Sequence, residues 1–429
     1  MSDDQIRPDQ KPALHLRQKS WRSTFESFGI VNFRWFLGAL CSDYASMNIQ
    51  MFIRGWLVFE ITDSYEKLGW MTAAGGVVGL FCAPLGGVLA DRVRQKKHVL
   101  QFGSSANACV TLGMAYFIIV DALSFYHLLT AAVLQGIIMN IMMPSRQALT
   151  KDVVGLDLLT NAIGLSTSGM NTSRLLLPGL AGGLLSALGG GYGNIDPAKW
   201  VYILITVFYL VSVLLLFKVM VSDRAETAMS KETLLSQISD GFAYVLRTPV
   251  ILMLLGCNFV IVFFSMAYFM LLPGFVKDVL DGGPDRLGLM ISVSGVGSLL
   301  CSLIIANLPN RHRARVLLNG SLLVGLSLLL FSLSTNYWLS LFLLFITGFG
   351  QAARMSISNV LIQTYVGDSY RGRVMSIYML EMSILSISVY PVSVLADYVG
   401  PQWAVGASAI CLIIFVSSLF AVPVYRDLH

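Results

Sequence analysis

Long apolar stretches follow one another along almost the whole chain. Each holds about 20 residues or more, the length that an α-helix needs to cross ~30 Å of hydrocarbon. Short polar segments separate them, and the one long polar connection lies in the middle. The pattern predicts twelve membrane-spanning helices, at residues 33–59, 66–90, 97–120, 123–145, 157–187, 199–220, 249–276, 285–307, 314–334, 336–365, 371–396 and 401–425.

The composition agrees with this pattern. Of 429 residues, 55% are hydrophobic and 12% are charged, whereas a soluble domain carries about 25% charged residues. Twelve spans use roughly 240 residues, which leaves no room for a large soluble domain. The sequence therefore predicts an all-α integral membrane protein with two pseudo-symmetric halves of six helices.

The distribution of lysine and arginine predicts how the helices are oriented. Cytoplasmic connections of membrane proteins carry an excess of these residues. Here they accumulate before the first span, after spans 2, 4, 8 and 10, and around the central connection. The connections on the other side hold only Lys67, Lys199, Lys277 and Arg286. We expect a multi-pass protein of the cell membrane, in a bacterium the inner membrane, with both termini in the cytoplasm.

The central polar connection divides the chain into two parts. The predicted organisation is a cytoplasmic tail at 1–30, an N-terminal half at 31–220, a linker at 221–248 and a C-terminal half at 249–429. Within the linker, apolar residues recur at helical spacing. This spacing predicts a short amphipathic helix on the membrane surface.

The two halves repeat one another. The sequence KLGWM at 67–71 returns as RLGLM at 286–290, and Pro178 has a counterpart in Pro391. Similar offsets at separate places predict a duplicated six-helix unit. Transporters build a central site from such repeats and open it to one side of the membrane at a time.

Several short motifs carry a family resemblance. Gly87–Arg92 (GVLADR), followed by basic residues, resembles the loop signature GxLADRxGRK, and Arg174–Gly183 (RLLLPGLAGG) resembles the exporter motif GPxxGG. Further similar segments are NFRWF at 32–36, WLVFEIT at 56–62, PSRQAL at 144–149 and RGRVM at 371–375. With these motifs the chain resembles the major facilitator superfamily, in its enterobactin-exporter and macrolide-efflux branch. Ala132 stands where drug exporters of the superfamily carry an arginine.

The resemblance implies a secondary active transporter. It would export a small amphipathic molecule, siderophore-like or drug-like, in exchange for protons, by alternating access, as a monomer and without a cofactor. Spans 1, 4, 7 and 10 line the central cavity in this superfamily. The implied substrate-binding residues on these spans are Gln50, Arg54, Gln135, Asn258, Tyr268, Gln351 and Arg354.

The motifs also imply residues that govern opening and closing. We expect Asp91 to cap a helix N-terminus across the interface of the halves, because a carboxylate is stabilised there. The clustered small residues of span 5 would let two helices approach closely. The implied gating residues are Asp91, Arg92, Arg174, Pro178, Gly182, Arg371 and Arg373.

Charged side chains within predicted spans point to a cavity or to buried pairs, because each costs at least ~2.5 kcal/mol on insertion scales. Asp43 shares one helical face with Met47, Gln50 and Arg54. We expect this stripe to line a groove and Asp43 to be the carboxylate that couples transport to protons. Glu381 in span 11 is the second candidate, and Asp397 lies near the end of the same span.

Alternatives remain open for both the function and the residues. The alternative function on the same fold is that of an uncoupled facilitator, or of a flippase or importer of a lipid-like or other small substrate. The alternative role of Asp43, Arg174 and Glu381 is structural: they would form buried pairs that hold the halves in register. Met139, Met142 and Met143 would be packing residues or an adaptable binding wall.

The remaining motif searches exclude other chemistry. The sequence has no GxxxxGK[ST] segment for ATP, no metal-binding spacing of histidines and no GxSxG elbow, so we expect neither an enzyme nor a metal site. A membrane sensor would need an output domain that no loop can hold. The basic loops follow the positive-inside rule and need no nucleic-acid partner; substrate, protons and membrane lipids are the expected partners. Free, packed thiols are expected at Cys41, Cys82, Cys109, Cys257, Cys301 and Cys411.

Overall fold

The described part of the chain is a bundle of α-helices. The computed structural model describes residues 26–92, 95–155, 157–191, 193–220, 234–306, 313–367 and 370–421, and within them all long elements are helical. Inside a bilayer a helix satisfies its own backbone hydrogen bonds, which is why apolar runs of this length fold this way. Phe102 and Leu214 lie on the outside of the bundle, 78% and 63% exposed, as lipid-facing side chains do.

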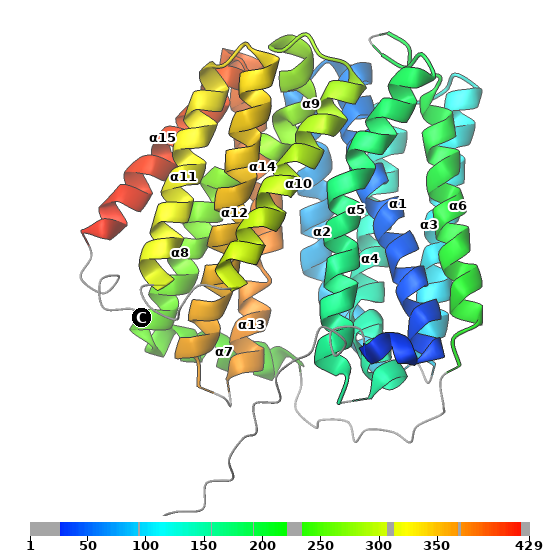
Figure 1. The fold of residues 1–429 in the computed structure, drawn as a ribbon, viewed down its shortest axis with the longest axis vertical. Coiled ribbons are helices and arrows are strands. Elements are labelled where there is room, and N and C mark those ends of the chain that lie inside the picture. Colours follow the sequence, from blue (N-terminus) through cyan, green and yellow to red (C-terminus); the bar gives the residue numbers. More distant parts are fainter. Residues whose placement is uncertain are drawn as a thin grey trace, which may run out of the picture.

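Two groups of helices lie side by side, with the N-terminal group on the right of Figure 1 and the C-terminal group on the left. The N-terminal half consists of α1 (Val31–Thr62), α2 (Tyr65–Arg92), α3 (Lys96–Ile119), α4 (Phe125–Val154), α5 (Leu159–Ala187) and α6 (Ala198–Phe217). The C-terminal half consists of α8 (Pro249–Ser265), α9 (Tyr268–Asp278), α10 (Pro284–Ala306), α11 (Arg313–Leu333), α12 (Tyr337–Tyr365), α13 (Arg371–Tyr378), α14 (Glu381–Val399) and α15 (Pro401–Phe420).

Nine stretches of the described chain are long and apolar enough to cross a membrane. They are α3, α4, α6, α8 with α9, α10, α11, α12, α13 with α14, and α15. α1, α2 and α5 complete the bundle and are more polar; α1 alone contains Arg34, Asp43, Arg54 and Glu60. The predicted all-α membrane fold is confirmed.

Two of the predicted single spans are broken. The span predicted at 249–276 is interrupted at Met266 and Ala267, and the one at 371–396 at Met379 and Leu380. The first break is stabilised by a side chain, since Gln351 Nε2 donates to the carbonyl oxygen of Ser265 at 2.8 Å. At the second, the Glu381 carboxylate lies in the first turn of α14, where the helix dipole favours it.

The fourth span is longer than predicted. We expected it to end at residue 145, with Arg146 in a basic loop, but α4 continues through Pro144 to Val154. Proline removes one backbone donor without ending this helix. Arg146 therefore lies inside the bundle and is 7% exposed.

The halves meet mainly along two helix pairs, α2 with α14 and α5 with α10, and α9 adds smaller contacts with α1 and α2. Small residues allow this approach. A Cβ atom on Gly182 would lie 2.3 Å from the carbonyl oxygen of Pro284, and one on Gly288 would lie 2.4 Å from that of Pro178. These predicted gating positions, Pro178 and Gly182, are therefore placed at the contact between the halves.

Helix α7 (Leu234–Arg247) lies across one end of the bundle, at the bottom of Figure 1. We call this the α7 end and the opposite one the far end. α7 packs on the start of α13, where the rings of Tyr244 and Tyr370 stack at 4.1 Å and Arg373 pairs with Asp240 at 3.4 Å. Of the predicted tail and linker, residues 1–25 and 221–233 lie outside the described residues.

The cysteines correct one expectation. The five described cysteines form no disulfide, but Cys109 and Cys411 are exposed on the surface of the bundle and are not packed. Cys82 lies where side chains are outside the described part of the chain.

Candidate functional site

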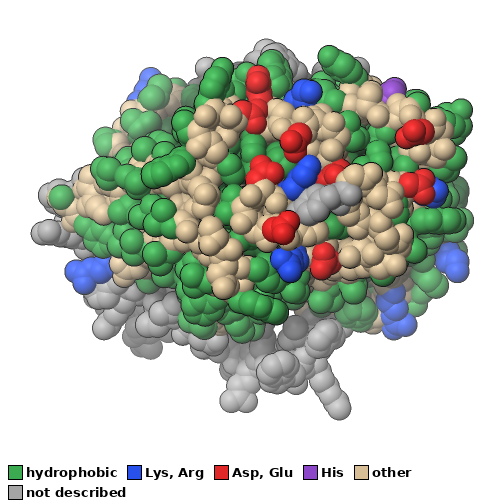
Figure 2. Space-filling view, turned by 90° about the horizontal axis from the view of Figure 1, so that it is seen from above, with side chains coloured by type: hydrophobic (Ala, Val, Ile, Leu, Met, Phe, Trp, Pro, Cys, Tyr) green, Lys and Arg blue, Asp and Glu red, His purple; other side chains and the backbone are tan. Residues whose placement is uncertain are grey.

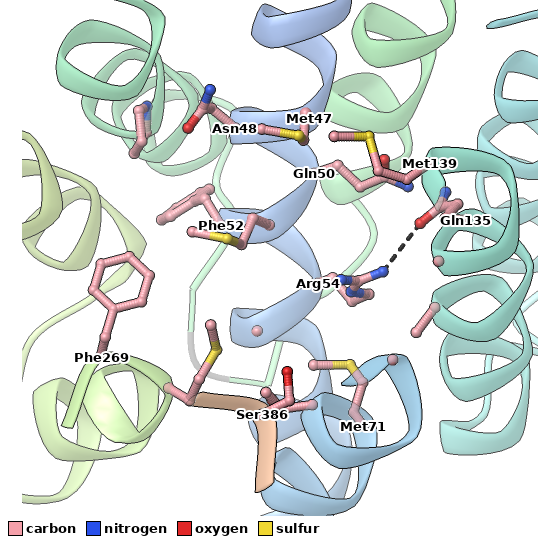
Figure 3. A pocket seen from close by; sticks show the side chains of 18 of the residues that line it. Met47, Asn48, Gln50, Phe52, Arg54, Met71, Gln135, Met139, Phe269 and Ser386 are labelled. Atoms are coloured by element: carbon pink, nitrogen blue, oxygen red, sulfur yellow. Dashed lines mark hydrogen bonds between the residues drawn. The ribbon is translucent and has the colours of Figure 1, made fainter. Parts of the chain in front are cut away.

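A cavity of about 300 Å³ lies between the halves, with most of its wall on the N-terminal half (Figure 3). The wall comes mainly from α1, α2 and α4, and the C-terminal half adds residues of α9, α10 and α14. Its polar and charged lining residues are Asp43, Asn48, Gln50, Arg54, Thr72, Asn107, Gln135, Arg146, Arg174, Tyr209 and Ser386.

The stripe on α1 lies on this wall. Asp43, Met47, Gln50 and Arg54 all line the cavity, because residues three and four apart share one face of a helix. Asp43 and Arg54 lie about three helical turns apart and have different partners, Arg146 for Asp43 and Gln135 for Arg54. The sequence pattern alone indicated this stripe.

Arg54 is held by a single side-chain hydrogen bond. Its NH1 group donates to Gln135 Oε1 at 3.0 Å, shown as the dashed line in Figure 3. Arg54 Nε and Gln135 Nε2 are buried and have no acceptor among the described residues. Nearby, Gln50 Oε1 accepts from the hydroxyl of Tyr209 at 3.2 Å. The wall thus presents donors that its own residues leave unused.

Asp43 is one partner of a buried ion pair. Its Oδ2 atom lies 3.1 Å from Arg146 NH2, and its Oδ1 atom accepts from Ser104 Oγ at 3.0 Å. The Arg146 guanidinium also lies over the ring of Tyr44, at 5.0 Å. Arg146 was not predicted as a site residue, and the signal that could have found it is the helical spacing of Met142, Leu149 and Val153, which continues the helix beyond Pro144.

Arg174 and Pro178 on α5 also line the cavity. Arg174 makes no hydrogen bond or ion pair with another described residue, and its side chain is exposed. It therefore contributes a second cation that no acidic group of the described chain neutralises.

Methionines form much of the apolar wall. Their unbranched, polarisable side chains adapt to ligands of irregular shape. Six of them line the cavity: Met47, Met51, Met71, Met139, Met142 and Met270. Of the three methionines singled out from the sequence, Met143 is the exception, since it does not line the cavity and is 39% exposed.

A second cluster of charge lies in the C-terminal half, apart from the cavity wall. Arg354 donates from NH2 to Glu381 Oε1 at 2.9 Å, from NH1 to Asn258 Oδ1 at 3.0 Å and from Nε to Gln351 Oε1 at 3.0 Å. Asn258 in turn donates to Glu381 Oε2 at 3.1 Å. The structure brings these four predicted site residues together, but none of them lines the cavity. Tyr268 does not line it either, although Phe269 and Met270 do.

The two ion pairs each lie within one half. Asp43 and Arg146 belong to α1 and α4, and Arg354 and Glu381 belong to α12 and α14. The interpretation that buried pairs hold the halves in register is therefore wrong for these two pairs. They join helices of the same half.

The remaining predicted gating residues lie in several places. Asp91 and Arg92 end α2, where side chains are outside the described part of the chain. Arg371 is the first residue of α13, and Arg373 contacts α7 through Asp240. The cap expected of Asp91 thus stays a prediction, and a different carboxylate forms a cap of this kind at the opposite end of the bundle.

That carboxylate is Asp397 of α14, at the far end. It accepts hydrogen bonds from the backbone N–H of Tyr65 at 2.7 Å and of Glu66 at 2.9 Å, and from Ser64 Oγ at 2.8 Å. It thereby caps the N-terminus of α2 across the interface of the halves. Lys277 adds a second link between the halves, at 3.0 Å from Asp63 Oδ1.

Seen from the far end, acidic side chains gather around the middle of the face, with a few cations among them (Figure 2). Tyr65 donates to Asp278 Oδ2 at 2.7 Å, and Gly193 donates its backbone N–H to Glu60 Oε1 at 2.7 Å. The halves are thus closed against each other at the far end.

Comparisons with known proteins agree on one kind of protein. A family model described as transmembrane secretion effector (MFS_3) matches residues 22–427. The chain is 24% identical over 366 residues to an uncharacterized MFS-type transporter, YfiS, of Bacillus subtilis (strain 168), which covers 83% of this chain and 84% of that protein. It is 23% identical over 366 residues to the staphyloferrin A transporter of Staphylococcus aureus (strain NCTC 8325 / PS 47), covering 83% and 88%.

Solved structures share the fold. A bacterial homologue of the human lysosomal transporter Spinster, in an inward-facing and unoccupied conformation, superimposes with a TM-score of 0.73 over 93% of this chain and 98% of that one, at 13% identity. The nucleoside transporter NupG gives a TM-score of 0.72 over 91% and 99%, at 12% identity.

Proposed function

The chain belongs to the major facilitator family of transmembrane secretion effectors, and on that premise we propose that it exports a small amphipathic molecule in exchange for protons. It is a multi-pass membrane transporter of small molecules and not an enzyme, as its family and its relatives are. The substrate, the direction and the proton coupling belong to the proposal.

The observation that carries the proposal is the cavity between the halves, with a carboxylate on its wall. It combines an apolar methionine wall with amide, hydroxyl and guanidinium groups. Such a lining suits a molecule with an apolar body and several polar groups. A siderophore-like compound fits this description, and one relative is named as a transporter of the siderophore staphyloferrin A.

Asp43 is the proposed proton-coupling residue. Its carboxylate is 5% exposed, lines the cavity and pairs with Arg146. Protonation would remove its negative charge and weaken that pair, which joins α1 to α4. We propose that the substrate-bound carrier reorients with Asp43 ionised and that the empty carrier returns only with Asp43 protonated. Glu381 remains the second candidate, because its bonds join α14 to α8 and α12.

The proposed cycle is alternating access by a monomer. In this proposal the far end is extracellular, the two termini are cytoplasmic, and the membrane is the inner membrane of a bacterium. The contacts of Asp397 with the start of α2 and of Lys277 with Asp63 would then close the outer side, and they would break when the halves rock apart. The domains of this proposal are the two halves and the linker that connects them at the α7 end.

The test of coupling is Asp43→Asn, in the purified chain reconstituted into vesicles. With a siderophore-like substrate, this variant should lose uptake driven by a pH gradient and still equilibrate substrate down its own gradient. Asp196→Asn, at an exposed carboxylate between α5 and α6, is the matched control and should keep both activities. Accumulation at the native level by Asp43→Asn would remove Asp43 from the coupling. Absence of any response to pH in the native chain would favour the uncoupled facilitator instead.

The orientation is tested by single cysteines in a chain without its native ones. Asn194→Cys, between α5 and α6, and Arg247→Cys, at the end of α7, are both exposed. A membrane-impermeant thiol reagent should label the first from outside the cell and the second only from inside. Labelling of both from one side would contradict the proposed topology.

A further inference from the structure

The charges on the cavity wall are unequal. Among the described lining residues there are three arginines, Arg54, Arg146 and Arg174, and one acidic residue, Asp43. The single carboxylate is already paired with Arg146. Arg54 and Arg174 therefore leave two positive charges with no counter-charge on the described wall.

Unused hydrogen-bond donors lie on the same wall. The buried Nε atoms of Arg54 and Arg146 and the Nε2 atom of Gln135 have no acceptor among the described residues. Buried donors are almost always satisfied in folded proteins. Guanidinium groups bind carboxylate and phosphate oxygens through paired hydrogen bonds. The group that would complete this wall is thus an oxyanion.

From these observations we infer that the substrate is an organic dianion, an apolar body carrying two carboxylates, bound by Arg54 and Arg174. This inference rests on the proposed transport function and names the substrate class of the same cavity. Two carboxylates match the two unpaired cations in number, and the methionine wall takes the apolar body. Asp43 repels an anion, which assigns the cations of α1 and α5, not the Arg146 pair, as the main ligands.

Charge also fixes how such a substrate relates to the proton. An anion in the cavity and a proton on Asp43 favour each other, because each lowers the charge that the other faces. They do not exchange by competing for one site. Exchange then requires that a carrier holding both the anion and the proton does not reorient, so that only the anion-bound carrier with Asp43 ionised and the empty carrier with Asp43 protonated cross over.

The first test measures the field in the cavity with two thiol reagents of similar size. In a chain without native cysteines, Met139→Cys and Met270→Cys place a thiol on the wall from the N-terminal and from the C-terminal half. Sulfonatoethyl methanethiosulfonate is an anion and trimethylammonioethyl methanethiosulfonate is a cation. We expect the anion-to-cation rate ratio to exceed that at an exposed Asn194→Cys by about tenfold.

Matched arginine variants assign the field to its source. Arg54→Gln should lower the rate ratio at both cavity cysteines by about threefold or more. Arg34→Gln removes the same charge from the same helix but outside the cavity, and should leave the ratio nearly unchanged. Faster reaction of the cation in the native cavity, or equal effects of the two variants, would overturn the inference.

The second test asks which molecule occupies the site. At pH 7.5, 2-hexylsuccinate should protect Met139→Cys from the anionic reagent, and Arg54→Gln should weaken that protection by about tenfold. Its neutral diamide should protect far less. Equal protection by dianion and diamide, or no protection by the dianion at about 10 mM, contradicts a dicarboxylate substrate. Protection by phosphatidylglycerol alone would assign the site to a lipid headgroup and overturn the proposal.

These measurements are made in detergent, without any gradient. Their outcome does not depend on whether transport is coupled to protons. A dianion that binds to a carrier whose transport is insensitive to pH would uphold the substrate class and refute the proton coupling. Transport that responds to pH without binding of the dianion would uphold the coupling and refute the substrate class.

Discussion

Each half of the bundle contains one buried pair of an arginine and a carboxylate, and the two pairs differ in their surroundings. Both arginines belong to corresponding helices, Arg146 to α4 and Arg354 to α12, with Arg354 one helical turn closer to the start of its helix. Exposure hardly separates them, at 7% and 1%. The two arginines differ in their hydrogen bonds, and Arg146 lines the cavity whereas Arg354 does not.

Arg354 is saturated in the sense that each of its three guanidinium nitrogens has an acceptor. Its Nε, NH1 and NH2 groups donate to Gln351, Asn258 and Glu381, and no group of this cluster lines the cavity. Arg146 donates to Asp43, keeps one buried nitrogen without an acceptor and borders the cavity. A fully satisfied network rigidifies the protein around it. A partly satisfied pair beside a cavity can exchange partners, which is what a transport cycle needs.

The largest expected effect comes from breaking the saturated pair. Arg354→Met leaves Glu381 buried without the arginine that neutralises it, and an uncompensated buried charge costs about 3–5 kcal/mol of unfolding free energy. Thermal unfolding of the purified chain in detergent should show a large loss of stability. The double variant Arg354→Met with Glu381→Leu should recover much of it, because an apolar pair can replace a buried ion pair.

The same substitution in the other half should cost less. Arg146→Met leaves Asp43 beside a polar cavity, where Ser104 and the cavity itself still solvate it, so we expect a loss of about 2 kcal/mol. The transport rate of Arg146→Met should fall by more than the loss of folded protein explains. Equal losses for Arg146→Met and Arg354→Met in the same unfolding assay would erase the distinction between the two pairs.

A third prediction concerns the contact that lets the halves act as separate bodies. Gly182→Ala places a methyl group against the Pro284 carbonyl, and we expect about 1.5 kcal/mol of destabilisation or a shift of the halves apart. Gly183→Ala, on the same helix, meets no atom within 4 Å and is the matched control. Labelling of a cavity cysteine should become faster only in Gly182→Ala. Indistinguishable behaviour of the two variants would contradict close packing there.

The smallest effect is expected at the far end. Asp397→Ala removes the cap from α2, and loss of such a cap costs about 1 kcal/mol. Because the cap joins the halves only when the far end is closed, the variant should shift the population toward a far-end-open state. The measurement is the labelling rate of Met71→Cys, which lies on the cavity wall. Asn194→Cys lies outside the contact at Asp397 and serves as the labelling reference. Unchanged labelling at Met71→Cys would mean that the cap does not bias the conformation.

Much of the fold could be predicted from the sequence, because hydrocarbon imposes one solution on a long apolar segment. The breaks in two spans could not, since they depend on distant residues. Gln351 satisfies the carbonyl of Ser265 from another helix, and nothing near residue 265 announces it. The length of α4 was missed because Arg146 and Lys151 were assigned to a basic loop, whereas the helix continues through both of them to Val154.

The candidate site was predicted in part for a similar reason. The stripe from Asp43 to Arg54 follows from helical periodicity within one element. Whether Arg354 lines a cavity or is sealed by amides depends on Asn258 and Gln351, which come from two different helices. Periodicity gives the face of a helix, and only the packing of several helices decides what that face meets.

The cap at Asp397 has a consequence for how this interface can evolve. Two of its three partners are backbone N–H groups, which every residue except proline supplies. Positions 65 and 66 can therefore drift without losing the bond, while position 397 has to keep a short acceptor side chain. Recognition through this cap is one-sided: Asp397 supplies the acceptor, and the N-terminal half supplies two backbone N–H groups and the hydroxyl of Ser64. A family of such carriers should show wide variation at position 66, which donates only its backbone N–H to the cap, and little at position 397, which supplies the acceptor.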